Sequence, residues 1–202
     1  SFLIILFLAN MDSNNLLIVG LGNPGKEYEK TRHNCGADFV EQLSLALDMS
    51  LTKEKKFSGL YGSKLIPTGK LHLCIPSVYV NESGKTVSSI KNYLKLSTRK
   101  ILVVHDELDL PLGKLKLKES GGHGGHNGLR NVIEHLNGDS SFKRLRIGIG
   151  HPEKEEDVVK YVLTKGSKKE RRILTSAFEE ALPIINTIIE GNWQKAMLDL
   201  HS

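Results

Sequence analysis

Cysteine is scarce in this chain of 202 residues, which contains only Cys35 and Cys74. Two thiols cannot form a disulfide framework, so a hydrophobic core has to hold the fold. A low cysteine count is also typical of proteins in reducing compartments. We therefore expect a cytoplasmic protein.

Apolar runs long enough to span a bilayer are lacking as well. The segment of residues 1–10 (SFLIILFLAN) is uncharged and mostly apolar, but it is too short for a transmembrane helix. It carries no basic residue, and no small-residue cleavage pattern follows it, which argues against a signal peptide. We expect residues 1–10 to be a non-native or disordered extension, residues 11–202 to form the folded domain, and no membrane to be a partner.

Internal repeats and linkers rich in proline, glycine or serine are also lacking, which indicates a single domain. A chain of this length can bury about 70% of its unfolded surface. Its 39% hydrophobic and 25% charged residues are ordinary for a globular protein. Lysine and arginine number 28 against 23 acidic residues, a net charge of +5. This excess suits a polyanionic partner, but charge alone favours a protein that is merely basic and has no such partner.

Short apolar runs alternate with segments of helical period, which predicts an α/β domain. Asn81 and Ser83 are candidate caps of the second helix, and Pro183 should kink or interrupt the last one, because proline lacks the N–H donor. We expect strands at residues 16–20, 57–65, 71–75, 101–104, 114–118 and 145–149, and helices at residues 36–49, 87–94, 129–136 and from 155 onward.

Two polar residues follow predicted strands. His33 lies between the first strand and the first helix, and Asp106 follows the strand at residues 101–104. Side chains at such positions project from the carboxyl edge of a parallel sheet, so we expect the two residues to lie close together. A histidine oriented by a buried carboxylate can act as a general base on water near neutral pH. In the alternative, His33 merely flanks a helix and Asp106 caps a turn.

Three glycines match the GxGxxG pattern of a dinucleotide-binding turn: Gly20, Gly22 and Gly25. In that turn a helix begins at the third glycine, and an acidic residue ends a second strand about 20 residues later. Here Pro24 and Tyr28 keep the chain in a loop, so the match is weak evidence for nucleotide binding.

Other chemistries have less support. A GxSxG elbow, which would place a serine nucleophile, is lacking. Cys35 lies two residues from His33 and could supply a thiolate, although a buried thiol is the alternative. Five side chains at predicted loop edges are of metal-ligating type: His33, His105, Asp106, His123 and His126. The spacing of His123 and His126 matches no known ligand motif.

Taken together, five segments resemble the bacterial-type peptidyl-tRNA hydrolases. They occur in the order of that family, with similar spacing, over about residues 16–200. The segments are residues 20–34 (GLGNPG, then Tyr28, Glu29 and TRHN), 81–84 (NESG), 103–113 (VVHDELDLPLG), 120–129 (SGGHGGHNGL) and 144–152 (RLRIGIGHP).

The resemblance implies a monomeric catalytic domain with a mixed, twisted β-sheet flanked by α-helices. It implies hydrolysis of the ester that joins a peptide to the 3′-terminal ribose of tRNA, without a metal or cofactor. Carried over by position, His33 activates water and Asp106 orients it. Asn81 or Asn127 could also stabilise the oxyanion, with helix capping as the alternative role. The substrate-binding residues implied are Asn23, Tyr28, Val80, Asn81, His126 and Asn127.

The resemblance also implies contacts with the acceptor stem and 3′ CCA end of peptidyl-tRNA. Lys118 and Arg146 would clamp a phosphate, with Lys116, Lys143 and Arg144 as candidates to widen the patch; a solvated basic face is the alternative. The glycine-rich loop before Asn127 would be a gate and residues 154–165 a lid.

The chain departs from the family pattern at two positions. Val80 stands where the family commonly has a flexible methionine, so affinity for the peptide could differ. Ile75 stands where the family commonly has lysine, which removes a charge near the site. An RNA-binding protein without turnover is the alternative function. His33 and Asp106 argue against it, because phosphate binding requires neither.

Overall fold

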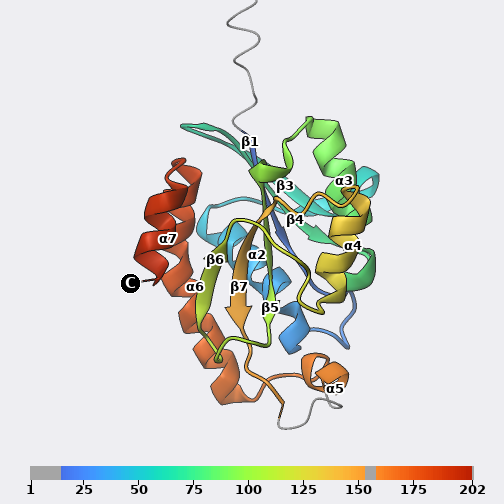
Figure 1. The fold of residues 1–202 in the computed structure, drawn as a ribbon, viewed down its shortest axis with the longest axis vertical. Coiled ribbons are helices and arrows are strands. Elements are labelled where there is room, and N and C mark those ends of the chain that lie inside the picture. The colour runs from blue at the N-terminus through green and yellow to red at the C-terminus, as the bar shows by residue number, and fades with distance from the viewer. Residues whose placement is uncertain (1–14, 153–157, 202) are drawn as a thin grey trace, which may run out of the picture.

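The computed structural model describes residues 15–152 and 158–201 (Figure 1). The expectation for residues 1–10 lies outside these residues, as does part of the expected lid. Within the described part, no helix is both long and apolar enough to cross a membrane.

A seven-stranded mixed sheet forms the centre of the described chain, in the order β2-β3-β4-β1-β5-β7-β6. Strands β4, β1, β5 and β7 are parallel to one another, whereas β2, β3 and β6 pair antiparallel with their neighbours. The strands are β1 (Asn15–Gly20), β2 (Thr52–Glu54), β3 (Gly59–Ile66), β4 (Gly69–Pro76), β5 (Ile101–Glu107), β6 (Leu115–Lys118) and β7 (Lys143–Gly148). The expected mixed α/β sheet is confirmed.

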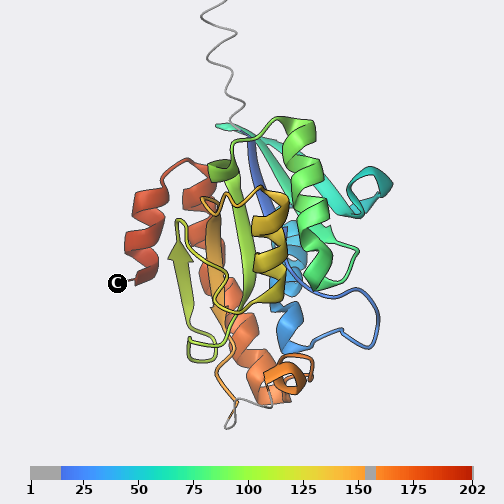
Figure 2. The same cartoon turned by 45° about the vertical axis from the view of Figure 1, so that its right-hand side comes forward.

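Helices cover both faces of the sheet (Figures 1 and 2). The core contains α2 (Cys35–Ala46), α6 (Lys168–Ile189) and α7 (Trp193–His201) on one face, and α3 (Ser83–Leu94) and α4 (Asn127–His135) on the other. Alternate residues of β5 divide between the two faces: Leu102 packs with the α2 and α6 side and Val103 with the α3 and α4 side. Fully buried central strands therefore read as continuous apolar runs.

Short elements surround the carboxyl ends of the parallel strands. These are α5 (Val158–Val162) and the 3-10 turns η1 (Arg32–Asn34) and η3 (Val80–Glu82); η2 (Lys55–Phe57) and η4 (Thr98–Lys100) lie elsewhere. Figure 1 shows α5 beyond the arrowheads of β5 and β7. No helix begins at Gly25, where the chain continues as a loop towards η1, so the dinucleotide-turn interpretation of the glycines is wrong.

Glycines bring α2 close to the sheet. A Cβ atom added at Gly36 would lie 2.3 Å from the carbonyl oxygen of Val104, and one added at Gly20 would lie 2.3 Å from the carbonyl oxygen of Gly36. A side chain at either position would force the backbone to shift, because these contacts are to backbone atoms. The start of α2, and with it η1, is therefore held against the ends of β1 and β5.

Strand β5 ends at Glu107, so Asp106 lies near its carboxyl end, as expected. Other local expectations were wrong. Asn81 lies in η3 and Ser83 is the first residue of α3, whose N-cap Glu82 makes no side-chain capping bond. Helix α6 runs past Pro183 without interruption. Pro183 is exposed, so solvent can bind the carbonyl group that loses its N–H partner.

Candidate active site

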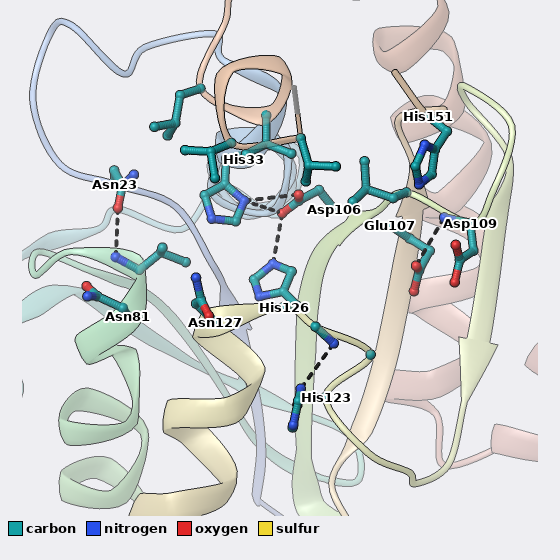
Figure 3. A pocket seen from close by; sticks show the side chains of 18 of the residues that line it. Asn23, His33, Asn81, Asp106, Glu107, Asp109, His123, His126, Asn127 and His151 are labelled. Atoms are coloured by element: carbon teal, nitrogen blue, oxygen red, sulfur yellow. Dashed lines mark hydrogen bonds and ion pairs between the residues drawn. The ribbon is translucent and has the colours of Figure 1, made fainter. Parts of the chain in front are cut away.

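A cavity of about 560 Å³ opens at the carboxyl end of β5 (Figure 3). The loop after β1, η3, the glycine-rich loop before α4, and α5 surround it. The site residues predicted from the sequence that line it are Asn23, His33, Val80, Asn81, Asp106, His126 and Asn127. The other lining residues are Tyr79, Glu107, Leu108, Asp109, His123, Gly124, Gly125, His151, Val158, Val159, Val162 and Leu163.

His33 and Asp106 are in direct contact. Nδ1 of His33 lies 2.9 Å from Oδ1 and 3.0 Å from Oδ2 of Asp106, and both side chains are buried. Burial alone would lower the pKa of His33, but attraction and hydrogen bonding from the carboxylate raise it above its usual value. The predicted proximity of these two strand-end residues is confirmed.

His126 makes a second contact with the same carboxylate. Its Nδ1 accepts the backbone N–H groups of Gly128 (3.1 Å) and Leu129 (3.3 Å), which caps α4. With Nδ1 as acceptor, the proton is on Nε2, which donates to Oδ1 of Asp106 at 2.9 Å. Burial would raise the pKa of Asp106, but His33 and His126 hold it well below its usual range. Asp106 is therefore an ionised carboxylate with two N–H donors.

The three predicted asparagines have different surroundings. The side-chain oxygen of Asn23 accepts the backbone N–H of Val80 at 2.7 Å, so Asn23 links the loop after β1 to η3. Asn127 accepts a hydrogen bond from Nη1 of Arg130 at 2.9 Å and does not cap α4; His126 does. Asn81 lines the same cavity (Figure 3).

Two further predicted residues form or support the wall. Val80 lines the cavity and is only 7% exposed. Tyr28 is not among the lining residues; its ring packs edge-to-face on that of Tyr79 with centroids 6.1 Å apart, and Tyr79 lines the cavity. Sequence reasoning also missed Asn34, whose side-chain amide bonds both backbone groups of Asn23 at 2.9 Å. The sequence signal that could have identified Asn34 is its position in the TRHN segment, directly after His33.

Among the described residues, one group has the spacing of metal ligands: His33, Asp106 and His126, whose ligand atoms lie within 4.8 Å of one another. Here the two imidazoles bind the carboxylate directly through hydrogen bonds. His105 and His123 do not join this group. Nδ1 of His105 bonds the backbone oxygen of Asp106 at 2.7 Å, and burial lowers its pKa to about 3. Nδ1 of His123 accepts the backbone N–H of Gly125 at 3.1 Å.

Basic side chains line a neighbouring cavity of about 310 Å³, which shares His123 and Gly124 of the glycine-rich loop with the first cavity. Lys118 is exposed, and Nε of Arg146 donates to Glu107 at 2.8 Å. Arg144 is 1% exposed and donates to the backbone oxygen of Gly121; burial, with Arg146 nearby, lowers its pKa to about 10. These three cations therefore gather beside the first cavity.

Strand register decides which other lysines belong to this patch. Lys116 pairs with Arg146, and Lys118 with Arg144, on one face of the sheet. Lys143 is one residue out of phase, and its Nζ lies 4.3 Å from the ring centroid of Trp193 in α7. The expectation that Lys143 widens the patch was therefore wrong, because adjacent residues of a strand point to opposite faces.

Comparison with known proteins agrees with this architecture. A family model described as peptidyl-tRNA hydrolase matches residues 17–202. The chain is 49% identical over 187 residues to a peptidyl-tRNA hydrolase of Saccharophagus degradans, covering 92% of this chain and 94% of that one. It is 47% identical to one from Pseudomonas putida, with coverages of 92% and 96%. It is similar in structure to the peptidyl-tRNA hydrolase of Acinetobacter baumannii, with a TM-score of 0.88, 42% identity, and coverages of 93% and 95%. The chain belongs to the peptidyl-tRNA hydrolase family.

Proposed function

We propose that this chain hydrolyses peptidyl-tRNA, cleaving the ester between the peptide carboxyl group and the 3′-terminal ribose to release peptide and tRNA. Membership of the family and the names of the relatives support this reaction. The observation that carries the mechanism is the pair of His33 and Asp106, 2.9 Å apart in the wall of the cavity.

His33 acts as the general base. Its Nδ1–H donates to Asp106, which leaves Nε2 to accept a proton from water as the water oxygen attacks the ester carbonyl carbon. The tetrahedral intermediate then breaks its bond to the ribose oxygen, which leaves with the proton held by the imidazolium. The negative charge of Asp106 stabilises this imidazolium during the reaction, and no metal takes part.

A side-chain amide stabilises the oxyanion of the intermediate. Asn81 and Asn127 line the cavity, and either could donate an N–H group to it. The hydrogen bond from Arg130 to the amide oxygen of Asn127 favours Asn127, because its NH₂ group is then left to donate. Asn23, Tyr28, Val80 and His126 shape the rest of the substrate site.

The patch of Lys118 and Arg146 binds phosphates of the acceptor stem while the 3′ CCA end enters the cavity. Arginine offers a planar fork to phosphate and lysine a point charge. The exposed position of Lys118 and the shared face of Lys116 and Arg146 support this placement. We propose that the protein acts as a monomer in the cytoplasm.

The test is release of labelled peptide from an N-acylated aminoacyl-tRNA, with and without EDTA, by the wild type and by His33→Ala. We expect release that survives EDTA and is lost in His33→Ala, with tRNA affinity retained. Thermal unfolding of both proteins confirms that each is folded.

Other outcomes would contradict the proposal. A folded wild type that binds tRNA without releasing peptide would be an RNA-binding protein. Release abolished by EDTA would instead make the group of His33, Asp106 and His126 a metal site.

A further inference from the structure

Arg32 connects the turn that carries His33 to helix α5. Its Nη1 donates to the backbone oxygens of Tyr161 (3.0 Å) and Thr164 (3.3 Å), and its backbone N–H donates to Thr164 as well (3.3 Å). The guanidinium lies 4.1 Å from the ring centroid of Tyr161. Nε and Nη2 bind Oε1 of Glu170 at 3.2 and 2.7 Å. One side chain therefore binds the end of α5 and the start of α6.

The partners of Arg32 are themselves held in place. Glu170 accepts the backbone N–H of Ser167 at 2.7 Å in a capping box at the start of α6. The hydroxyl of Tyr161 donates to the backbone oxygen of Ile149, just beyond β7, at 2.6 Å. The side chain of Arg32 is only 11% exposed. A lysine at this position could not form the same fork of hydrogen bonds, because its ammonium group is a single point.

Helix α5 and the residue after it present apolar side chains to the cavity that contains His33. These side chains, which we call the α5 wall, are Val158, Val159, Val162 and Leu163. Val159 is 69% exposed and Leu163 is 37% exposed. Figure 3 shows the helix directly beside His33. Exposed apolar residues gathered at the mouth of a catalytic cavity are typical of a surface that binds an apolar group.

We propose that the α5 wall binds the apolar side chain of the peptide residue that is esterified to tRNA, and that Arg32 is the positioning residue that holds this wall beside His33. The inference rests on the function proposed above, since it assigns the peptide end of the same substrate. Because Arg32 and His33 are consecutive in η1, the wall and the base are held at a defined separation. The enzyme therefore prefers substrates whose last peptide residue is large and apolar.

The test compares two substrates built on the same tRNA, one carrying N-acetylglycine and the other N-acetylleucine. The variants are Val159→Ser, which makes an exposed wall residue polar, and Arg32→Lys, which keeps the charge and removes the fork. Arg172→Gln, an exposed position on α6, is the control. For each protein kcat and KM are measured on both substrates, together with the pH profile and thermal unfolding.

We expect the wild type to favour the leucyl substrate in kcat/KM by about tenfold, the lower end of the range for apolar pockets. Both Val159→Ser and Arg32→Lys should reduce this preference to about threefold or less, through a higher KM for the leucyl substrate. Hydrolysis of the glycyl substrate should change by a smaller factor than hydrolysis of the leucyl substrate, and the pH profile should be retained. Arg172→Gln should match the wild type.

Three results would overturn the inference. One is a wild type that cleaves both substrates equally well, which leaves the proposed function intact. A second is a preference that survives Val159→Ser, a variant whose exposed position carries little risk for folding. The third is an Arg32→Lys variant that slows both substrates by the same factor, which would make Arg32 structural only. A wild type that cleaves neither substrate would instead refute the proposed function.

Discussion

Replacing Asp106 with asparagine tests the proposed base directly. His126 donates from Nε2, because its Nδ1 caps α4, so it requires an acceptor at Oδ1 of residue 106. The asparagine oxygen must therefore occupy this position, which places its NH₂ group at the Oδ2 position, 3.0 Å from Nδ1 of His33. Nδ1 of His33 also lies 2.9 Å from that oxygen, but the oxygen already accepts from His126, so the new NH₂ donor favours Nδ1 of His33 as an acceptor, with the proton on Nε2. This is the wrong tautomer for taking a proton from water.

The expected loss follows from the role that is removed. General-base catalysis contributes about 10²–10⁴ to the rate, which corresponds to about 3–5.5 kcal/mol in the barrier at about 1.4 kcal/mol per tenfold. Single-turnover release of labelled peptide from N-acylated aminoacyl-tRNA, with enzyme in excess, measures this step. Asp109→Asn, the same change at a carboxylate lining the same cavity, should keep the wild-type rate.

The dependence of the rate on pH tests the same role of Asp106 independently, through the direction in which the midpoint moves. His33 must be deprotonated to act as a base, so the wild-type rate should rise with pH through a midpoint above the usual histidine pKa, since the Asp106 carboxylate raises the pKa of His33. Asp106→Asn removes that negative charge, so the midpoint should move to lower pH. A folded Asp106→Asn enzyme within tenfold of the wild-type rate, with an unmoved midpoint, would refute this reasoning.

Three other substitutions test separate parts of the structure. His126→Ala removes the α4 cap, worth about 0.5–2 kcal/mol, and a donor to a buried carboxylate, worth about 1.5–3 kcal/mol. Urea unfolding should therefore show that the free energy of unfolding falls by about 2–5 kcal/mol. A smaller decrease would contradict the double role of His126. Lys118→Ala should reduce the slope of log affinity for tRNA against log salt by about 0.7–0.9, whereas Lys53→Ala, on the opposite edge strand β2, should leave it unchanged. Gly36→Ala would place a Cβ atom 2.3 Å from the carbonyl oxygen of Val104, so we expect a loss of about 1–3 kcal/mol from overpacking and slower hydrolysis; a variant with wild-type melting temperature and rate would show that the contact relaxes freely.

Much of the architecture was accessible from the sequence because the central strands are buried on both faces. Residues 16–20 and 101–104 are uninterrupted apolar runs, and in the structure they pair in parallel, with Gly20 opposite Val104. The carboxyl ends of parallel neighbours lie at one edge of the sheet. That rule predicted that His33 and Asp106 lie close together, and the structure places them in direct contact.

The errors lie where a local signal competes with tertiary structure. Asn81 and Ser83 have good capping side chains, yet η3 runs directly into α3 and neither caps it. Pro183 is a helix breaker by composition, but the apolar stripe of α6 packs on the sheet on both sides of it, with Ala181 and Ile185 buried. Burial of such a stripe contributes more than the one hydrogen bond that proline removes.

The role of His126 could not be predicted, because it depends on the directions of hydrogen bonds. Two backbone N–H groups at the start of α4 require Nδ1 of His126 to be an acceptor, so Nε2 carries the proton and must face an acceptor. Asp106 is ionised, because its pKa lies well below the usual range, so it accepts from both imidazoles, and this favours the proton on Nδ1 of His33. Nε2 of His33 is then the atom left with a free lone pair. The cap of α4 thereby helps to set the tautomer of the proposed base, although neither His33 nor Asp106 belongs to that helix.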